Sequence, residues 1–110
     1  MGKFIITKRT NGEYQFNLEA ANGKVILTSG GYATKVGCNK GIESVKTNAP
    51  TDARYDRKIA KNRAHYFNLK AANGEIIGTS QMYTTADSRD NGIESVKENV
   101  PNASVNDETI

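Results

Sequence analysis

Several residue types that carry chemical function in other proteins are scarce in this chain. It has one cysteine, one histidine, two prolines and no tryptophan among 110 residues. A lone cysteine excludes an intrachain disulfide, and a zinc or iron site needs about three or four convergent ligands. We therefore expect no metal site and no cofactor, and we expect Cys38 to be a buried or half-buried, inert thiol.

Long apolar runs are missing as well. Residues 1–8 contain no stretch with the length of a signal-peptide core or a membrane span. Gly2 is followed by Thr7, whereas the myristoylation pattern has Ser or Thr one place earlier. The sequence predicts a soluble, cytoplasmic protein that has no contact with a membrane.

Motifs for catalysis are missing too. The chain has neither the glycine-rich phosphate loop nor the dinucleotide-binding fingerprint. Cys38 and His65 are the one thiol–imidazole pair that the composition allows, and such a pair acts only within hydrogen-bond reach. They lie in different halves of the chain, and Arg89 and Tyr14 stand at their counterpart positions. We predict no catalytic residues, and an enzyme is the least favoured class.

What the chain does contain is an internal repeat. The six residues from Gly41 to Lys46 return unchanged from Gly92 to Lys97, and 20 of the 35 positions from Phe16 to Pro50 are identical 51 residues later. This is a tandem duplication. A unit of about 50 residues is close to the size at which a lone core is marginal. We therefore expect one pseudo-symmetric monomeric domain over 1–110, with repeat 1 at about 1–52, repeat 2 at about 53–106, and a short tail over 107–110. The composition suggests disorder only from Asn106 onward.

Hydrophobic periodicity predicts the elements of each repeat. Residues 14–20 and 65–71 alternate apolar and polar side chains, which is typical of half-buried strands. Asn-Gly pairs at 11–12, 22–23 and 73–74 predict two-residue hairpin turns in which both residues have positive φ. At the fourth turn Asn62-Arg63 replaces Asn-Gly, which predicts a different or strained turn. Further strands are expected at 4–8, 25–28, 54–60, 75–79 and 103–107, with 54–60 both closing the first unit and opening the second.

Two helices are expected, at 34–48 and 86–99, and Thr34 is a suitable N-cap. Gly41 and Gly92 are either points of close backbone approach or the true helix starts. Asn48 and Asn99 suit the left-handed residue that follows a helix. The predicted order is β-β-β-α-β-β-β-α-β, with seven or eight strands, both helices on one face and a polar, solvated face opposite. The polar set on that opposite face is Gln15, Asn17, Glu19, Asn68 and Lys70.

The combined motif resembles the YegP-like family of small bacterial proteins. Its parts are an Ala-Ala-Asn-Gly hairpin, Thr-Ser-x-x-Tyr, and Gly-Ile-Glu-Ser-Val-Lys-x-Asn, all present in both repeats. The resemblance implies an α+β fold of two tandem β3-α-β repeats. These would form one pseudo-twofold domain with a shared antiparallel-rich sheet, exchanged C-terminal strands and two helices on one face. It implies no assigned biochemical activity.

A basic segment suggests a nucleic-acid contact. Net charge is +3, and five cations alternate with aromatic residues between positions 54 and 66. Cations interleaved with aromatic side chains are typical of single-strand binding grooves. The alternative, which we favour, is a solvated strand and turn whose charges keep a sheet edge from aggregating. The candidate contact residues are Arg54, Arg57, Lys58, Lys61 and Arg63.

Polar residues retained in both repeats are the second candidate. Structural roles explain most of them, because tyrosines can anchor the crossing from sheet to helix and serines can allow close helix packing. The other interpretation is a repeated polar surface formed by Asn17, Asn68, Tyr32, Tyr83, Lys46 and Lys97. We expect a non-enzymatic binding or accessory module with an unknown partner, possibly a protein; a weak nucleic-acid binder is the alternative.

Overall fold

The structure is a computed structural model that describes residues 2–110, so Met1 lies outside the described residues. The elements follow the predicted order. The first repeat contributes β1 (Lys3–Lys8), β2 (Tyr14–Glu19), β3 (Val25–Thr28) and α1 (Lys35–Asn48). After a short 3-10 turn over Asp52–Arg54 come β4 (Tyr55–Ile59), β5 (His65–Lys70), β6 (Ile76–Thr79), α2 (Ala86–Asn99) and β7 (Ser104–Asp107).

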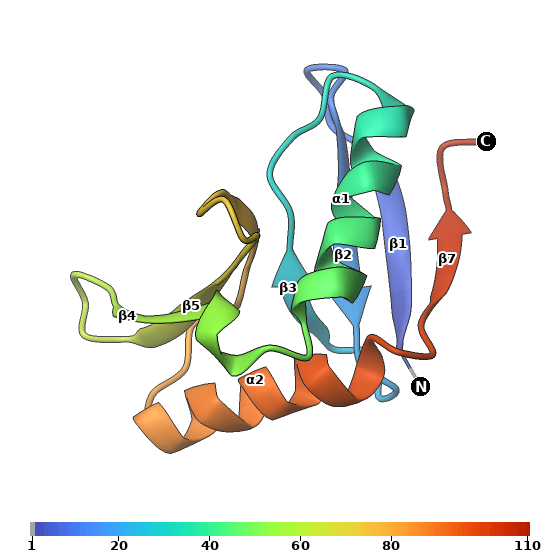
Figure 1. The fold of residues 1–110 in the computed structure, drawn as a ribbon. Coiled ribbons are helices and arrows are strands. Elements are labelled where there is room, and N and C mark those ends of the chain that lie inside the picture. Colours follow the sequence, from blue (N-terminus) through green and yellow to red (C-terminus); the bar gives the residue numbers. More distant parts are fainter. Residues whose placement is uncertain (1) are drawn as a thin grey trace.

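All seven strands belong to one mixed sheet, ordered β4-β5-β6-β3-β2-β1-β7. Every neighbouring pair is antiparallel except β1 and β7, which run parallel. The half-sheet β1-β2-β3 and the half-sheet β4-β5-β6 meet at a single residue pair, Thr28 and Thr79. Figure 1 shows the consequence: β1 and β2 run in a markedly different direction from β4 and β5, so the sheet is strongly bent.

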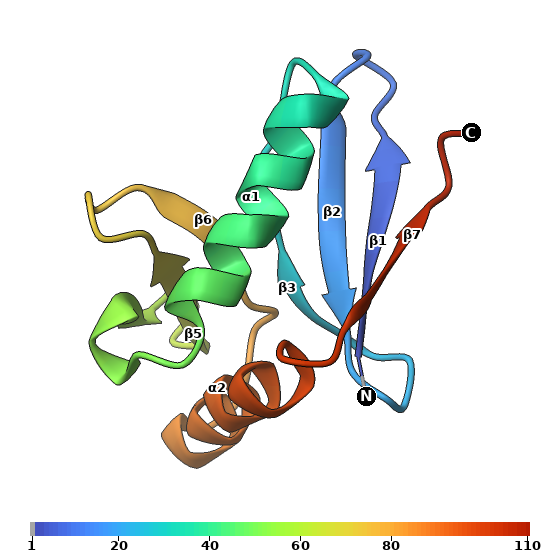
Figure 2. The same cartoon turned by 45° about the vertical axis from the view of Figure 1, so that its right-hand side comes forward.

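The two strands that follow the helices take different places. β4 follows α1 and pairs with β5, so it both closes the first repeat and opens the second, as predicted. β7 follows α2 but lies beside β1, in the half-sheet of the first repeat. Figure 2 shows β7 running along β1, far from β5. The chain's last strand is therefore held by the first repeat.

Both helices pack across the two half-sheets. α1 contacts β2 and also β5 and β6, while α2 contacts β5 and also β3. The buried apolar residues form a single cluster that includes both halves. Its largest fully buried members are Phe4, Phe16, Phe67, Ile6, Leu18, Leu27, Ile42, Leu69, Ile93, Val45, Val96 and Val100. One continuous core of this size explains why two units of marginal length are stable together.

The internal glycines of the helices are points of close approach. Both helices are continuous through Gly41 and Gly92, so the alternative of a late helix start is wrong. A Cβ at Gly41 would stand 2.7 Å from Cζ of Tyr32, and one at Gly92 would stand 2.7 Å from Cζ of Tyr83. Each tyrosine ring therefore lies against helix backbone where a side chain would otherwise be.

The caps differ at the two helix ends. Thr34 is the N-cap as predicted: its hydroxyl accepts the Gly37 N–H at 3.0 Å. The expectation for Asn48 is wrong, because it remains helical and Ala49 after it has φ −56°. Its side-chain amide instead donates to the Ser44 carbonyl at 2.8 Å. Asn99 and Ser95 repeat this bond at 2.8 Å in α2. The asparagines thus satisfy a carbonyl one turn back, without a left-handed residue.

The hairpin turns contain three residues rather than two. In the first, the Arg9 N–H donates to the Glu13 carbonyl and the Gly12 N–H donates to the Arg9 carbonyl. The same pair of bonds recurs in the turns over 20–24, 60–64 and 71–75. In the three turns that contain Asn-Gly, only the glycine has positive φ, and the asparagine side chain accepts the N–H two residues later. The prediction that both residues need positive φ is therefore wrong, since a turn with one extra residue places that demand on the last position alone.

Arg63 occupies the glycine position of the fourth turn, with φ +67°. This conformation costs a residue with a Cβ roughly 1–2 kcal/mol, so the expected strain is confirmed. Replacing Arg63 with glycine should raise the free energy of unfolding by up to about 1 kcal/mol. This is the relief of the backbone strain minus the stability lost because glycine increases the entropy of the unfolded chain. Urea denaturation measures this. Gly74→Ala in the matching turn is the converse control and should destabilise; a loss of stability in Arg63→Gly would contradict the account.

The tail is ordered in part, contrary to the expectation of disorder from Asn106. Asn106 pairs with Ile5 inside the sheet. The Glu108 N–H donates to the Ile6 carbonyl at 3.0 Å, and Asp107 lies 2.9 Å from the Lys35 ammonium. Few apolar contacts hold this segment, which explains why its composition suggested disorder. Backbone bonds and one ion pair fix it instead.

Candidate functional site

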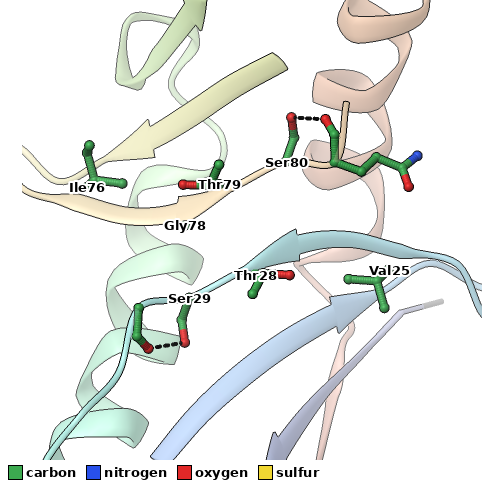
Figure 3. Close-up of a pocket in the computed structure, with 9 residues that line it drawn as sticks. Val25, Thr28, Ser29, Ile76, Gly78, Thr79 and Ser80 are labelled. Carbon is green, nitrogen blue, oxygen red and sulfur yellow. Dashed lines mark hydrogen bonds between the residues drawn. The ribbon is translucent and has the colours of Figure 1, made fainter. Parts of the chain in front are cut away.

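A hollow lies where the two half-sheets meet. It has a volume of about 590 Å³ and spans β3 and β6, with the Thr28–Thr79 pair in the middle. Figure 3 shows β3 and β6 diverging on either side of that pair, with the helices behind the strands. Its walls come from equivalent positions of the two repeats. The lining residues are Val25, Thr28, Ser29, Gly30, Ile76, Gly78, Thr79, Ser80 and Gln81.

A polar row crosses the sheet at this hollow. Strand register places Asn17 beside Thr28, Thr28 beside Thr79, and Thr79 beside Asn68. The Thr79 hydroxyl donates to Oδ1 of Asn68 at 2.8 Å. On the other side, Oδ1 of Asn17 is buried and has no hydrogen-bond partner. Buried polar atoms are almost always satisfied in proteins, so Asn17 leaves one acceptor of this row free, on the residue paired with Thr28.

The polar face is less solvated than predicted. Asn68 is only 7% exposed, and Gln15, Asn17, Glu19 and Lys70 are half-buried. In a sheet of seven strands, most outward residues have neighbours on both sides, and these cover one another's flanks. The face is therefore polar but largely covered.

The repeated serines have structural roles. The Ser29 hydroxyl accepts the Phe16 N–H at 2.9 Å and donates to the Gly30 carbonyl at 2.8 Å. Ser80 makes the equivalent bonds to Phe67 and Gln81, at 3.0 and 2.7 Å. Each hydroxyl bridges two strand segments, so neither is free to bind a ligand.

The other repeated polar residues do not gather on one surface. Tyr32 stacks on Phe16 with ring centroids 6.2 Å apart, on the helix side of the sheet. Burial raises the pKa of its hydroxyl. Lys46 pairs with Glu43 along α1 at 3.4 Å. Asn17 and Asn68, by contrast, lie on the opposite face of the sheet from the core cluster.

In the second repeat Tyr83 occupies the place of Tyr32 against its helix. Lys97 forms one more ion pair than Lys46. Its ammonium lies 3.2 Å from Glu94 and 3.0 Å from Asp52. Hydrogen bonds from Lys97 and Arg57 hold the pKa of Asp52 below its usual value. This lysine ties α2 to the turn that precedes β4, and it is not a free cation for a ligand.

Two of the predicted nucleic-acid contacts are engaged within the protein. Nε of Arg54 donates to Oδ1 of Asn48 at 3.0 Å, at the end of α1. Arg57 lies between Asp52 and Asp90, at 3.3 and 3.2 Å. Both guanidinium groups therefore brace the junction of the helices with β4.

The other three cations lie further along the same hairpin. Lys58 is 3.8 Å from Asp56, on the face opposite Arg57. Lys61 and Arg63 are exposed in the turn over 60–64. The structure thus divides the predicted set between the two faces of β4 and the tip of the hairpin, with Tyr66 beside Lys58 in the sheet.

A second hollow of about 300 Å³ lies between α1 and the β5–β6 turn. Tyr32, Lys40, Ser44 and Glu75 are among its lining residues. Glu75 is exposed at the turn, so this hollow places no buried acid beside the tyrosine. The thiol of Cys38 is buried inside the core, as predicted, and burial raises its pKa. A protonated buried thiol is a poor nucleophile.

Two further observations concern the described residues, 2–110. No cluster of three or more His, Cys, Asp or Glu side chains is arranged there to hold a metal ion. None of the helices has the length and apolar character needed to cross a membrane.

Reasoning from the sequence missed the hollow at the β3–β6 junction. The retention of Thr28-Ser29 as Thr79-Ser80 was a usable signal, because these residues line it from both sides. The sequence did not reveal that β3 and β6 are neighbours, because hydrophobic periodicity does not determine how strands of different repeats are ordered in the sheet.

Comparison with known proteins places the chain in a family. A family described as "Domain of unknown function (DUF1508)" matches residues 10–56 and 60–107. A UPF0339 protein of Shewanella oneidensis is 53% identical over 108 residues, covering 98% of each chain. The UPF0339 protein YegP of Escherichia coli is 50% identical over 108 residues, again with 98% of each chain covered.

Solved structures agree with this. The solution NMR structure of YegP from E. coli, described as a protein of unknown function, matches with a TM-score of 0.93 at 50% identity. The match covers 97% of this chain and 92% of that one. The match to each repeat, the near-complete coverage and the common fold leave one conclusion: this chain belongs to the DUF1508 family of uncharacterised UPF0339, YegP-like proteins, with two copies of the family's repeat.

Proposed function

We propose that the protein is a non-catalytic binding module and that the hollow at the β3–β6 junction is its binding surface. In this proposal the chain is one pseudo-twofold domain, and the hollow lies on its internal axis. The observation that carries it is the composition of the walls. They come in equivalent pairs, such as Thr28 and Thr79, and they include no acid, base or thiol.

The walls also indicate the chemistry of the ligand. Hydroxyl and backbone groups flank two apolar side chains, Val25 and Ile76. The unpartnered Oδ1 of Asn17 offers an acceptor on the strand next to Thr28. Sites of this volume bind small molecules through apolar contact and a few placed polar groups. A neutral ligand with hydrogen-bond donors fits such walls better than an ion does.

Nucleic-acid binding is the second candidate, and one observation favours it. Lys58, Lys61, Arg63 and Tyr66 lie together on the β4–β5 hairpin. Cations with an aromatic side chain in reach suit a single strand, which binds by backbone attraction and base stacking. Because Arg54 and Arg57 are engaged by Asn48 and by Asp52 and Asp90, we expect this binding to be weak.

One set of NMR titrations tests both candidates. A panel of neutral amide and sugar fragments is added to the ¹⁵N-labelled full chain, and then single-stranded RNA at two salt concentrations. The proposal expects fragment-induced shifts at residues 25–30 and 76–81. Thr28→Val with Thr79→Val should reduce fragment affinity about tenfold, because each lost hydrogen bond is worth roughly 0.5–1.5 kcal/mol.

The control is Thr84→Val, an exposed threonine outside the hollow. Fragments that shift no amide in these segments, or that bind the double variant equally well, would reject the hollow as a binding surface. RNA binding that weakens steeply with salt and is lost in Lys61→Gln with Arg63→Gln would support the second candidate instead.

A further inference from the structure

The two ends of the sheet are not equivalent. β1 and β4 occupy corresponding positions in the repeats, 51 residues apart. β7 covers the outer edge of β1, whereas no strand of the described chain pairs with the outer edge of β4. An uncovered edge presents unpaired N–H and C=O groups to other chains. The fold thus shows how one edge is filled and leaves its counterpart open.

The filled edge shows how a strand docks there. β7 runs parallel to β1, with Phe4 opposite Val105 and Ile6 opposite Asp107. Its ladder includes bonds from the Ser104 N–H to the Gly2 carbonyl at 3.3 Å and from the Glu108 N–H to the Ile6 carbonyl at 3.0 Å. Little apolar surface takes part. A polar, extended segment is therefore enough to occupy an edge of this kind.

The open edge presents the same backbone groups. The Arg9 and Ala60 N–H groups donate to the Glu13 and Ala64 carbonyls in their own hairpins. Because bonding direction alternates along a strand, Arg57 and Ile59 aim their N–H and C=O groups away from β5. Of their counterparts in β1, Ile6 pairs with Asp107 and accepts the Glu108 N–H, whereas Lys8 lies just beyond the paired residues of β7.

Charge selects the occupant. Residues 52–63 contain five cations and two carboxylates, which equals the +3 net charge of the whole chain. The segment that fills the other edge, residues 104–110, carries Asp107 and Glu108 and no cation. Bonds from Thr109 and Lys35 lower the pKa of Asp107 to about 2, so this acid is ionised where it docks. At the open edge, Arg57 stands at the position of Ile6, but its guanidinium is already paired with Asp52 and Asp90. The cations that would attract an acidic strand there are therefore the exposed Lys61 and Arg63, at the end of β4.

We propose that the outer edge of β4 binds an extended acidic peptide of a partner protein as an eighth strand, parallel to β4, in the way β7 binds β1. Main-chain bonds to Arg57 and Ile59 supply the affinity, and the local excess of cations supplies the selectivity. Peptides that add a strand to a sheet edge divide these tasks in the same way. The positive charges along β4 disfavour pairing with a neutral strand or with another copy of β4. They favour pairing with an acidic strand.

The test uses the ¹⁵N-labelled full chain and a peptide with the sequence of residues 104–110. A second peptide with Asn and Gln in place of its two acids is the charge control. We expect the acidic peptide to shift the Arg57 and Ile59 amides, and the neutral peptide to bind up to about tenfold more weakly, because each solvent-exposed ion pair contributes only modestly to affinity.

Ile59→Pro removes one outward N–H without breaking the β4–β5 ladder, because proline is tolerated where the N–H faces solvent. Its side chain is 65% exposed, so little packing is lost. We expect peptide affinity to fall about tenfold, with β5 amide positions retained, while Ile59→Ala binds normally. The proposal is overturned if millimolar peptide leaves Arg57 and Ile59 unshifted, if the shifts appear at Phe4–Lys8 through exchange with β7, or if Ile59→Pro binds unchanged.

Discussion

Neither half of the chain, cut between Asp52 and Ala53, is expected to fold as a monomer. A unit of this length buries too small a fraction of its surface to be stable alone. In the whole chain α1 rests partly on β5 and β6, and α2 rests partly on β3. Cutting would therefore expose the apolar stripe of each helix to water, and β7 would lose β1. At low concentration, we expect the circular dichroism signal of each fragment to change gradually with temperature, without a cooperative transition.

The same contacts predict that the two fragments complement each other. No backbone continuity at position 52 is needed for α1 to contact β5, so an equimolar mixture should recover helical signal and a cooperative transition that depends on concentration. Sedimentation of the mixture should give one heterodimer. The intact chain at equal concentration is the control. A fragment that melts cooperatively as a dispersed monomer would refute the shared core.

The regular elements were predictable because they depend on local pattern. Alternation over 14–20 and 65–71 predicted β2 and β5, and Thr34 as N-cap predicted the start of α1. The turn type was not predictable in the same way. An Asn-Gly pair fits both a two-residue turn and the last positions of a three-residue turn, and the choice depends on how the flanking strands pair.

The candidate site was not predictable, because it arises from contacts between the repeats. Periodicity assigns Asn17 and Asn68 to the polar face, but it does not reveal that Asn68 is buried or that Asn17 lacks a partner. The split of the basic segment had the same cause. Arg57 and Lys58 are adjacent in sequence and point to opposite faces of a strand, so one of them meets the helix carboxylate Asp90.

Replacement of Gly78 with leucine should strongly destabilise the β3–β6 junction. Gly78 corresponds to Leu27 in the first repeat, and Leu27 is fully buried. A Cβ at Gly78 would stand 2.6 Å from Cγ of Leu27. Since the junction holds one large side chain and not two, Gly78→Leu should lower the free energy of unfolding by about 3 kcal/mol or more. Leu27→Gly should cost about 3–5 kcal/mol through the cavity it leaves.

The double variant Leu27→Gly with Gly78→Leu separates crowding from other effects. If the half-sheets are related by an internal twofold, the leucine enters the same space from the opposite strand, and most of the lost stability should return. Urea denaturation of the four proteins gives the coupling energy directly. Gly78→Ala, destabilising alone and neutral beside Leu27→Gly, is the matched control. If the losses of stability in the double variant are additive, the two strands do not face the junction equivalently. The proposal that the hollow lies on an internal twofold axis would then be wrong.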